Sequence, residues 1–367
     1  MVNRREALLG FGVLALSSSV RAQKGAPSND DELRKLVAAF DFFRKRNGDD
    51  YAIGTPKLIE EAKYVKIGGI EQWVTIRGED QDNPVVLVLH GGPGDATNPW
   101  GYAGFRTWLK AYTVVQWDQR GTGKTLGRNR SAPAEALTID QMVQDGVELA
   151  DALRALLKKD KIILLGHSWG SVLGVLMAKR RPELFRAFVG TGQVVDLEVA
   201  HRVAYDALLA KARALGDARA IHELQEIGPP PYKDWRGYQV KRRWSNLYEG
   251  ADAFIASMLG FGLSAPGYTL SDVNDWFDGQ NLSAERLMPQ QRALASTVFT
   301  GRFAVPVFVI QGAEDFTTPT SLAKAFVNGV EAPQKRFTTI TGGHFEVFMN
   351  SSEFMKEMSA MLAIPAR

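Results

Sequence analysis

The feature that most constrains this chain is an alternation of short strands and helices that stops and later resumes. Apolar runs at 85–89, 113–117 and 162–165 are typical of strands buried on both faces of a parallel sheet, with helical patterns between them. From 196 to 300 there are only helical patterns, and the alternation returns with a strand at 305–310. We therefore predict an α/β fold with a mostly parallel central sheet, flanked by helices and interrupted by a helical insertion.

Chain length and composition agree with such an arrangement. The 367 residues, 45% hydrophobic and 23% charged, suit one large catalytic core plus an insertion. We assign the core to residues 23–195 and 301–367, and a helical cap to residues 196–300. Before the alternation begins, Gly68-Gly69 joins two β-rich runs and predicts a hairpin.

The N-terminal segment has the pattern of a targeting signal. A pair of arginines, Arg4-Arg5, precedes an apolar run that is too short to span a bilayer permanently. Val20 and Ala22 occupy the −3 and −1 positions of a cleavage site, which leaves Gln23 as the mature start. We predict that residues 1–22 are a twin-arginine-like export signal and that the protein is periplasmic. An uncleaved amphipathic helix is the alternative.

Charge and cysteine content exclude several classes of protein. The formal net charge of +3 is small, and we interpret the basic cluster at 241–243 as a solvated helix face, so a nucleic-acid partner is not expected. The absence of cysteine excludes disulfides, thiolate metal sites and cysteine nucleophiles. No two histidines have a ligand-like spacing, and we predict no metal site.

Residues 166–170, Gly-His-Ser-Trp-Gly, match the pattern G-x-S-x-G. The pattern follows the strand at 162–165 and opens a helix, which is where a nucleophile elbow occurs. Glycines are needed there because a Cβ at Gly166 or Gly170 would clash in so sharp a turn. We predict Ser168 as the nucleophile that attacks a carbonyl carbon.

The serine needs a base and an acidic residue that orients the base. The chain has five histidines: His90, His167, His201, His222 and His344. We predict His344 as general base and acid, because it follows the last strand and lies at the strand end where ligands meet a parallel sheet. Asp315, after the strand at 305–310, is the predicted third member, with Glu314 as the alternative. The order Ser168, Asp315, His344 is that of α/β-hydrolases.

A negatively charged intermediate needs two backbone N–H donors. Trp169, the residue after the nucleophile, supplies one by the geometry of the elbow. The second is predicted in the loop His90–Gly94, where the glycines allow the backbone to approach the substrate closely, and Gly92 is the stronger candidate.

Three motifs together resemble the proline iminopeptidase family of α/β-hydrolases. They are His90–Gly94, Asp118–Gly123 and Gly166–Ser171. The similarity covers about residues 61–195 and 303–362. It implies an eight-stranded core with a helical cap, a Ser-Asp-His triad, no cofactor, and removal of an N-terminal residue, often proline, from peptides or arylamides.

An aminopeptidase has to recognise a free ammonium group, which requires a carboxylate in the site. In the family a cap glutamate that follows closely spaced tryptophans does this. The nearest match here is Trp244–Glu249, with Tyr248 in place of the second tryptophan. Glu249 is therefore a candidate substrate-binding residue, and a solvated glutamate at a helix end is the alternative.

We predict a serine hydrolase that acts on a small molecule or a short peptide. Two other functions stay open. One is a carboxylesterase that uses the same triad on small apolar esters, since Trp, Phe and Met recur between 244 and 278. The other is a catalytically silent binding protein on the same scaffold.

Overall fold

The structure, a computed structural model, describes residues 29–294 and 296–363. The chain divides into two compact units, one ending at Phe42 and one beginning at Phe43, and the second unit contains the sheet. The predicted export signal, residues 1–22, lies outside the described residues. Every helix in the described ranges is too short or too polar to cross a membrane.

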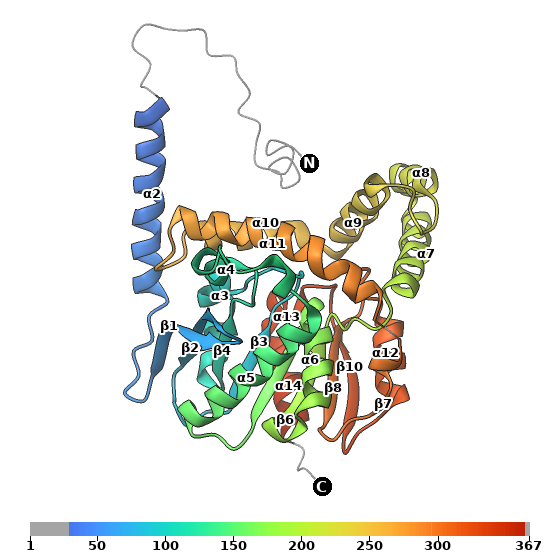
Figure 1. Ribbon diagram of the computed structural model, residues 1–367. Helices are drawn as coiled ribbons and strands as arrows, with labels where there is room; N and C mark the ends of the chain where they lie inside the picture. The colour runs from blue at the N-terminus through green and yellow to red at the C-terminus, as the bar shows by residue number, and fades with distance from the viewer. Residues whose placement is uncertain (1–28, 295, 364–367) are drawn as a thin grey trace, which may run out of the picture. The chain divides into compact units, whose positions relative to one another are not determined.

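Eight strands form one sheet in the order β1-β2-β4-β3-β5-β6-β8-β10. The pairs β1–β2 and β2–β4 are antiparallel and the other neighbours are parallel, which confirms the mostly parallel sheet predicted from the sequence (Figure 1). Strands β7 and β9 form a separate parallel pair. The strands are β1 (Ile59–Ile67), β2 (Ile70–Gly78), β3 (Val85–Leu89), β4 (Thr113–Trp117), β5 (Ile162–His167), β6 (Phe185–Thr191), β7 (Gly301–Arg302), β8 (Val307–Gly312), β9 (Val330–Glu331) and β10 (Lys335–Ile340).

The helices alternate with the parallel strands and also fill the long interval between β6 and β8. They are α2 (Asn29–Asp50), α3 (Asn98–Gly104), α4 (Gly123–Arg128), α5 (Ile139–Leu157), α6 (Trp169–Arg180), α7 (Leu197–Leu215), α8 (Ala218–Ile227), α9 (Trp235–Glu249), α10 (Ala251–Leu263), α11 (Leu270–Arg292), α12 (Thr320–Gly329), α13 (Glu346–Met349) and α14 (Ser351–Leu362). Short 3₁₀ helices are η1 (Arg106–Lys110), η2 (Ala134–Ala136), η3 (Pro182–Leu184) and η4 (Ser296–Phe299).

The edge strand β1 and the central strands differ in burial for a physical reason. Strand β1 alternates between half-buried and exposed residues, as expected for an edge strand with one face in solvent, whereas every residue of β3 and β5 is buried. The predicted hairpin between β1 and β2 is confirmed. Its two turn residues, Gly68 and Gly69, both have positive φ, at 55° and 82°, which is the requirement of a tight hairpin turn.

The core lies on both faces of the sheet. One hydrophobic cluster joins the strands to α5, α6 and α12, and the other joins them to η1 and α14. All parallel strands run in the same direction, so their carboxyl ends meet at one edge of the sheet. The loops after β3, β5, β8 and β10 are therefore held close together at that edge.

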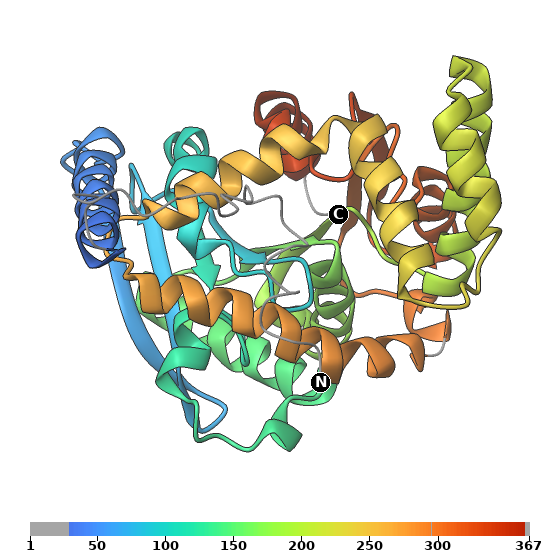
Figure 2. The same cartoon turned by 90° about the horizontal axis from the view of Figure 1, so that it is seen from above.

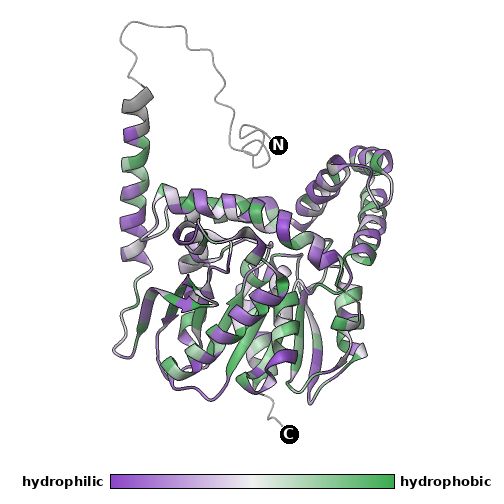
Figure 3. Cartoon of the chain, viewed as in Figure 1, coloured by the Kyte–Doolittle hydropathy of each residue, from purple (hydrophilic) through white to green (hydrophobic). Residues whose placement is uncertain are grey.

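Helices α7–α11 make up the helical insertion of this chain. It begins at α7, whose N-cap Asp196 accepts a hydrogen bond from the N–H of Val199. Helices α10 and α11 extend across the sheet edge described above, and α7, α8 and α9 stand at one side (Figures 1 and 2). Hydrophilic and hydrophobic residues alternate along these helices, which is typical of helices with one buried face (Figure 3).

Candidate active site

The turn between β5 and α6 holds Ser168 in a strained backbone conformation. Its φ is 52° and its ψ is −121°, a combination that costs a non-glycine residue about 1–3 kcal/mol. A Cβ on Gly166 would lie 2.5 Å from the carbonyl oxygen of Gly170, and a Cβ on Gly170 would overlap the carbonyl oxygen of Leu89. The N-terminal end of α6 directly follows Ser168, and its N–H groups favour negative charge there. This is the geometry of a nucleophile elbow.

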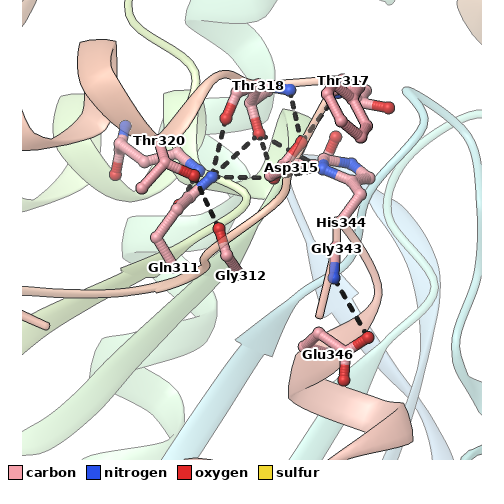
Figure 4. Close-up of polar contacts among 12 residues, drawn as sticks. Gln311, Gly312, Asp315, Thr317, Thr318, Thr320, Gly343, His344 and Glu346 are labelled. Carbon is pink, nitrogen blue, oxygen red and sulfur yellow. Dashed lines mark hydrogen bonds and ion pairs between the residues drawn. The ribbon is translucent and has the colours of Figure 1, made fainter. Parts of the chain in front are cut away.

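Asp315 and His344 meet in the loops that follow β8 and β10 (Figure 4). Nδ1 of His344 lies 2.9 Å from Oδ2 of Asp315. Oδ1 of Asp315 accepts the backbone N–H groups of Thr317 and Thr318, at 2.8 and 2.7 Å. Oδ2 also accepts the hydroxyl of Thr318 and the amide of Gln311, at 2.8 and 2.7 Å. Because the carboxylate accepts, Nδ1 carries the imidazole proton, and Nε2 is left as the basic nitrogen.

Two opposing effects act on the charge of His344. Burial on its own lowers the pKa of His344, because it penalises the imidazolium. The charge of Asp315 and its hydrogen bond to Nδ1 act in the other direction, and the charge of Glu249 adds to them. The result is a pKa of His344 above its usual value. The pair is therefore suited to stabilising an imidazolium during a reaction.

Ser168 lies at the same edge of the sheet. Its N–H donates to the carbonyl oxygen of Thr191, at the end of β6, over 3.0 Å. Gly192, which follows Thr191 in the chain, lies against the imidazole of His344, since a Cβ on Gly192 would be 2.8 Å from Cε1 of that ring. The ring centroid of His167, which precedes Ser168, is 4.9 Å from that of His344. The loops that carry the three predicted triad residues are thus gathered in one place.

Glu314, the alternative to Asp315, has a different environment. Its side chain is 56% exposed and accepts a hydrogen bond from Nζ of Lys211 at 2.6 Å. Asp315 is thus the carboxylate that reaches the imidazole. Among the described residues, no three histidine, cysteine, aspartate or glutamate side chains gather as metal ligands would.

The loop after β3 reaches Ser168 through its glycines. A Cβ on Gly91 would lie 3.4 Å from the Cβ of Ser168. Gly92 is exposed and has φ 112°, and no described residue accepts its N–H. Trp169 is the first residue of α6, so its N–H has no intrahelical acceptor. The glycine loop thus lies beside Ser168, and the roles of Gly92 and Trp169 as donors to a negatively charged oxygen stay predictions.

His90 supports this loop. The N–H of Gln119 donates to Nε2 of His90 over 3.4 Å, so Nδ1 carries the proton and donates to the carbonyl oxygen of Gly91 over 2.9 Å. The side-chain oxygen of Gln119 accepts the indole N–H of Trp169 at 3.2 Å. Burial lowers the pKa of His90 to about 4, so this imidazole is neutral at physiological pH. His90 and Gln119 therefore connect the glycine loop with the start of α6.

Glu249, the predicted substrate-binding residue, ends α9 and lies against the triad loops, not in solvent. It is 8% exposed. Its Oε1 accepts the N–H of Phe316 and its Oε2 accepts the N–H of His344, both at 2.8 Å. A Cβ on Gly343 would lie 2.5 Å from Cγ of Glu249, so this approach requires glycine. Burial, followed by the charge of Asp315, raises the pKa of Glu249 to about 7. Substrate binding by Glu249 stays a prediction.

Lys241 lies two turns before Glu249 on α9 and is 5% exposed, so the interpretation of its basic cluster as a solvated face is wrong for this residue. Its Nζ donates to the carbonyl oxygen of Phe316 at 2.5 Å. Burial lowers the pKa of Lys241 to about 8, against the opposing charges of Asp315 and Glu249. Both polar backbone groups of Phe316 are therefore held from α9, the N–H by a carboxylate and the carbonyl by an ammonium group.

An aromatic cluster adjoins His344. The ring of Phe345 is 5.2 Å from that of His344, and Phe254 of α10 lies 5.5 Å from Phe345. Phe254 also stacks on Phe348, with centroids 5.8 Å apart and an interplanar angle of 5°. Trp100 meets Phe348 edge-on at 4.8 Å. The three phenylalanines are only partly buried, so the cluster forms an apolar wall beside the imidazole.

Known proteins resemble this chain over most of its length. The family model of the alpha/beta hydrolase fold matches residues 84–223. A proline iminopeptidase from Lactobacillus delbrueckii subsp. lactis is 32% identical over 308 residues, which cover 82% of this chain and 97% of that protein. The chain belongs to the proline iminopeptidase family.

Two further comparisons concern a relative and a fold. The probable aminopeptidase YbaC of Bacillus subtilis (strain 168) is 29% identical over 287 residues, covering 77% of this chain and 89% of that protein. The crystal structure of a proline iminopeptidase-related protein from Thermus thermophilus has the same fold, with a TM-score of 0.59 and 21% identity over 83% of this chain and 98% of that one. The predictions of an α/β-hydrolase fold and of a serine hydrolase that resembles proline iminopeptidase are confirmed.

For this member of the proline iminopeptidase family, sequence reasoning missed three polar side chains that hold the triad loops. They are Gln311, Thr318 and Lys241. Thr318 had a local signal, because aspartate side chains often bond to the backbone two or three residues later, as Asp315 does here. Gln311 contacts Asp315 and Thr318, four and seven residues later, whereas Lys241 acts through a contact 75 residues away that no local pattern indicates.

Proposed function

We propose that the protein is a serine aminopeptidase of the proline iminopeptidase type, which hydrolyses small amides or short peptides through an acyl-enzyme on Ser168. The observation that carries this proposal is the Asp315–His344 pair, 2.9 Å apart, at the same sheet edge as the Ser168 elbow, in a chain of this family. The names of two relatives, a proline iminopeptidase and a probable aminopeptidase, support the choice of an amide substrate with a free amino end.

The proposed reaction assigns a role to each of these groups. Nε2 of His344 takes the hydroxyl proton as Oγ of Ser168 bonds to the carbonyl carbon, and Asp315 stabilises the imidazolium. The N–H groups of Gly92 and Trp169 hold the negatively charged oxygen. His344 then gives the proton to the leaving amine as the C–N bond breaks. Water, deprotonated by His344, cleaves the acyl-enzyme and restores Ser168.

We assign the role of a cap to the helical insertion. Helix α10 contributes Phe254 to the aromatic wall beside His344, and α9 holds the loop that carries Asp315. The wall favours an apolar acyl group, such as the ring of proline, next to the imidazole.

Turnover of L-proline p-nitroanilide, N-acetyl-L-proline p-nitroanilide and p-nitrophenyl butyrate tests the proposal, with Ser168→Ala as control. We expect cleavage of the free-amine anilide, little cleavage of the acetylated one, and loss of both anilide and ester turnover in the variant. Ester turnover without any anilide turnover would contradict the aminopeptidase and favour the carboxylesterase. Turnover that survives Ser168→Ala would contradict the nucleophile.

A further inference from the structure

A buried lysine of the helical insertion binds the chain next to the triad aspartate. We propose that Lys241 is a positioning residue of the reaction, and that its ammonium group orients the carboxylate of Asp315 through a single peptide unit. That unit joins Phe316 to Thr317. The inference rests on the triad chemistry of the proposed function, and it does not depend on the amino end of the substrate.

The peptide unit between Phe316 and Thr317 lies between the two charged side chains. Its carbonyl oxygen accepts from Nζ of Lys241 at 2.5 Å, and its N–H, which is that of Thr317, donates to Oδ1 of Asp315 at 2.8 Å. The unit is trans, so it is planar and its C=O and N–H point in opposite directions. Because the unit is rigid, the bond that fixes the direction of the oxygen also fixes the direction of the N–H.

The two oxygens of Asp315 divide the work of orientation. Oδ1 is held by the backbone N–H groups of Thr317 and Thr318, whereas Oδ2 lies 2.9 Å from Nδ1 of His344. A change in the direction of the Thr317 N–H would move Oδ1, and the carboxylate would then turn and move Oδ2 away from the imidazole. Errors of this kind in the position of a catalytic group lower the rate of the chemical step.

The charge of Lys241 strengthens this arrangement. Lys241 is 5% exposed, and burial of an ammonium group is costly unless opposite charges and hydrogen bonds offset it. The dipole of the peptide unit has its oxygen towards the ammonium group and its N–H towards the carboxylate of Asp315. Both charges therefore polarise the unit in the same sense and strengthen its two hydrogen bonds. A neutral amine would hold the oxygen less strongly.

The ammonium group is lost in a range of pH that can be measured. Burial lowers the pKa of Lys241 to about 8, and the charges of Asp315 and Glu249 act against this fall. Two histidines also interact with Lys241: His344, whose pKa the charge of Lys241 lowers, and His201 of α7, which is neutral because burial lowers its pKa to about 4. Lys241 is therefore charged below pH 8 and becomes neutral as the pH rises through about 8. The rate of acylation should fall over the same range.

The test measures kcat and KM for p-nitrophenyl butyrate across neutral and alkaline pH. This ester has no amine, and His344 is already neutral at alkaline pH, so neither causes a fall in rate there. We expect kcat of the unaltered protein to fall as the pH rises through about 8. Lys241→Met should lower kcat at neutral pH about 10- to 100-fold with KM within about threefold, and it should remove the alkaline fall.

Lys241→Arg separates the charge from a merely structural role. A guanidinium group stays charged throughout the measured range, so this variant should keep kcat within about tenfold and lose the alkaline fall. Lys211→Met is the matched control. Lys211 lies over the ring of Phe316, 5.5 Å from its centroid, and pairs with Glu314, so the variant removes a positive charge near Phe316 without touching the peptide unit. It should keep both the kcat and the alkaline fall of the unaltered protein.

Three results would overturn the proposal. They are a kcat of Lys241→Met within about threefold of the unaltered value, an alkaline fall that persists in Lys241→Arg, and no alkaline fall in the unaltered protein. If Lys241→Met does not fold, the other two results still decide. Ester turnover without turnover of prolyl anilide would contradict the proposed aminopeptidase and leave this test intact.

The proton resonance of His344 Nδ1–H gives a measurement that needs no turnover, because it reports directly on the bond to Asp315. We expect this resonance to shift as the pH rises through about 8, and to shift in Lys241→Met but not in Lys211→Met. A protein that hydrolyses nothing would contradict the proposed function, and this resonance would still test Lys241. A resonance that is the same with and without the ammonium group would contradict the role of Lys241.

Discussion

The loops at the sheet edge and the helical insertion meet at one site but are positioned by different forces. Ser168, Asp315 and His344 follow β5, β8 and β10, which lie in a continuous run of the sheet with β6 between the first two. Glu249 and Lys241 belong to α9 and contact the same loops through their side chains. Hydrogen-bonded strands thus set the positions of the triad residues, whereas side chains of α9 hold the loops that carry Asp315 and His344. Substitutions of the triad residues at the sheet edge should therefore have the largest effects on turnover, and substitutions in the insertion should have smaller ones.

The largest effect is expected for the nucleophile. Ser168→Ala should lower kcat by about a million-fold for amides and esters alike, because the covalent step is lost. The fold should remain, which circular dichroism checks. Ser257→Ala, an exposed serine of α10, is the control and should behave like the unaltered protein. Comparable losses of kcat in Ser168→Ala and Ser257→Ala would contradict the difference expected between the loops at the sheet edge and the insertion.

Asp315→Asn should cost about ten thousand-fold in kcat. The pKa of His344 is raised mainly by Asp315. Because His344 acts as a base only when it is neutral, the activity of the unaltered protein should fall with decreasing pH. The midpoint of this fall should lie above the usual pKa of histidine. Removing the carboxylate charge lowers that pKa, so the acid limb of kcat/KM should move to lower pH. Glu314→Gln should leave the profile in place, and a shift there would contradict the assignment.

Glu249→Gln tests the contacts that the insertion makes with the loops of Asp315 and His344. A glutamine has one acceptor oxygen and an NH₂ group, so it can accept from only one of the two N–H groups, of Phe316 and His344, that Glu249 now binds. Loosening these loops should lower kcat about 10- to 100-fold. Stopped-flow or steady-state rates on a neutral ester give the measurement, with Asp252→Asn at the start of α10 as control. A change in KM alone would indicate substrate binding instead.

The smallest effect is expected at the start of the insertion. Asp196→Ala removes the side chain that caps α7 and should lower the free energy of unfolding by about 1 kcal/mol. Thr138→Ala removes the corresponding cap of α5 in the core and should cost about the same. Urea unfolding measures both. Only the insertion variant is expected to change the KM for a prolyl anilide, and equal kinetics in the two variants would weaken the idea that the insertion acts as a cap.

Most of the sheet edge could be predicted from the sequence, because its signals are local. The glycines around Ser168 and the buried strand before them are adjacent in the chain, and they determine the turn without reference to other segments. Asp315 follows a strand whose apolar run is equally plain, whereas the strand before His344, Lys335–Ile340, is more polar. The parallel sheet then brings these strand ends together whatever the details of the loops.

The insertion was far less predictable for a physical reason. Lys241 has the sequence context of a solvated basic face, and its burial depends on the carbonyl oxygen of Phe316, which lies 75 residues further along the chain. A contact of such separation leaves no periodic pattern, so only the folded structure places Lys241 beside the loop of Asp315.

The most direct test of this account is covalent labelling with a fluorophosphonate, followed by mapping of the labelled peptide by mass spectrometry. The account predicts one label, on Ser168, that disappears in Ser168→Ala and forms much more slowly in His344→Ala. A label on another residue, or no label on a folded protein that hydrolyses its substrates, would contradict Ser168 as the nucleophile.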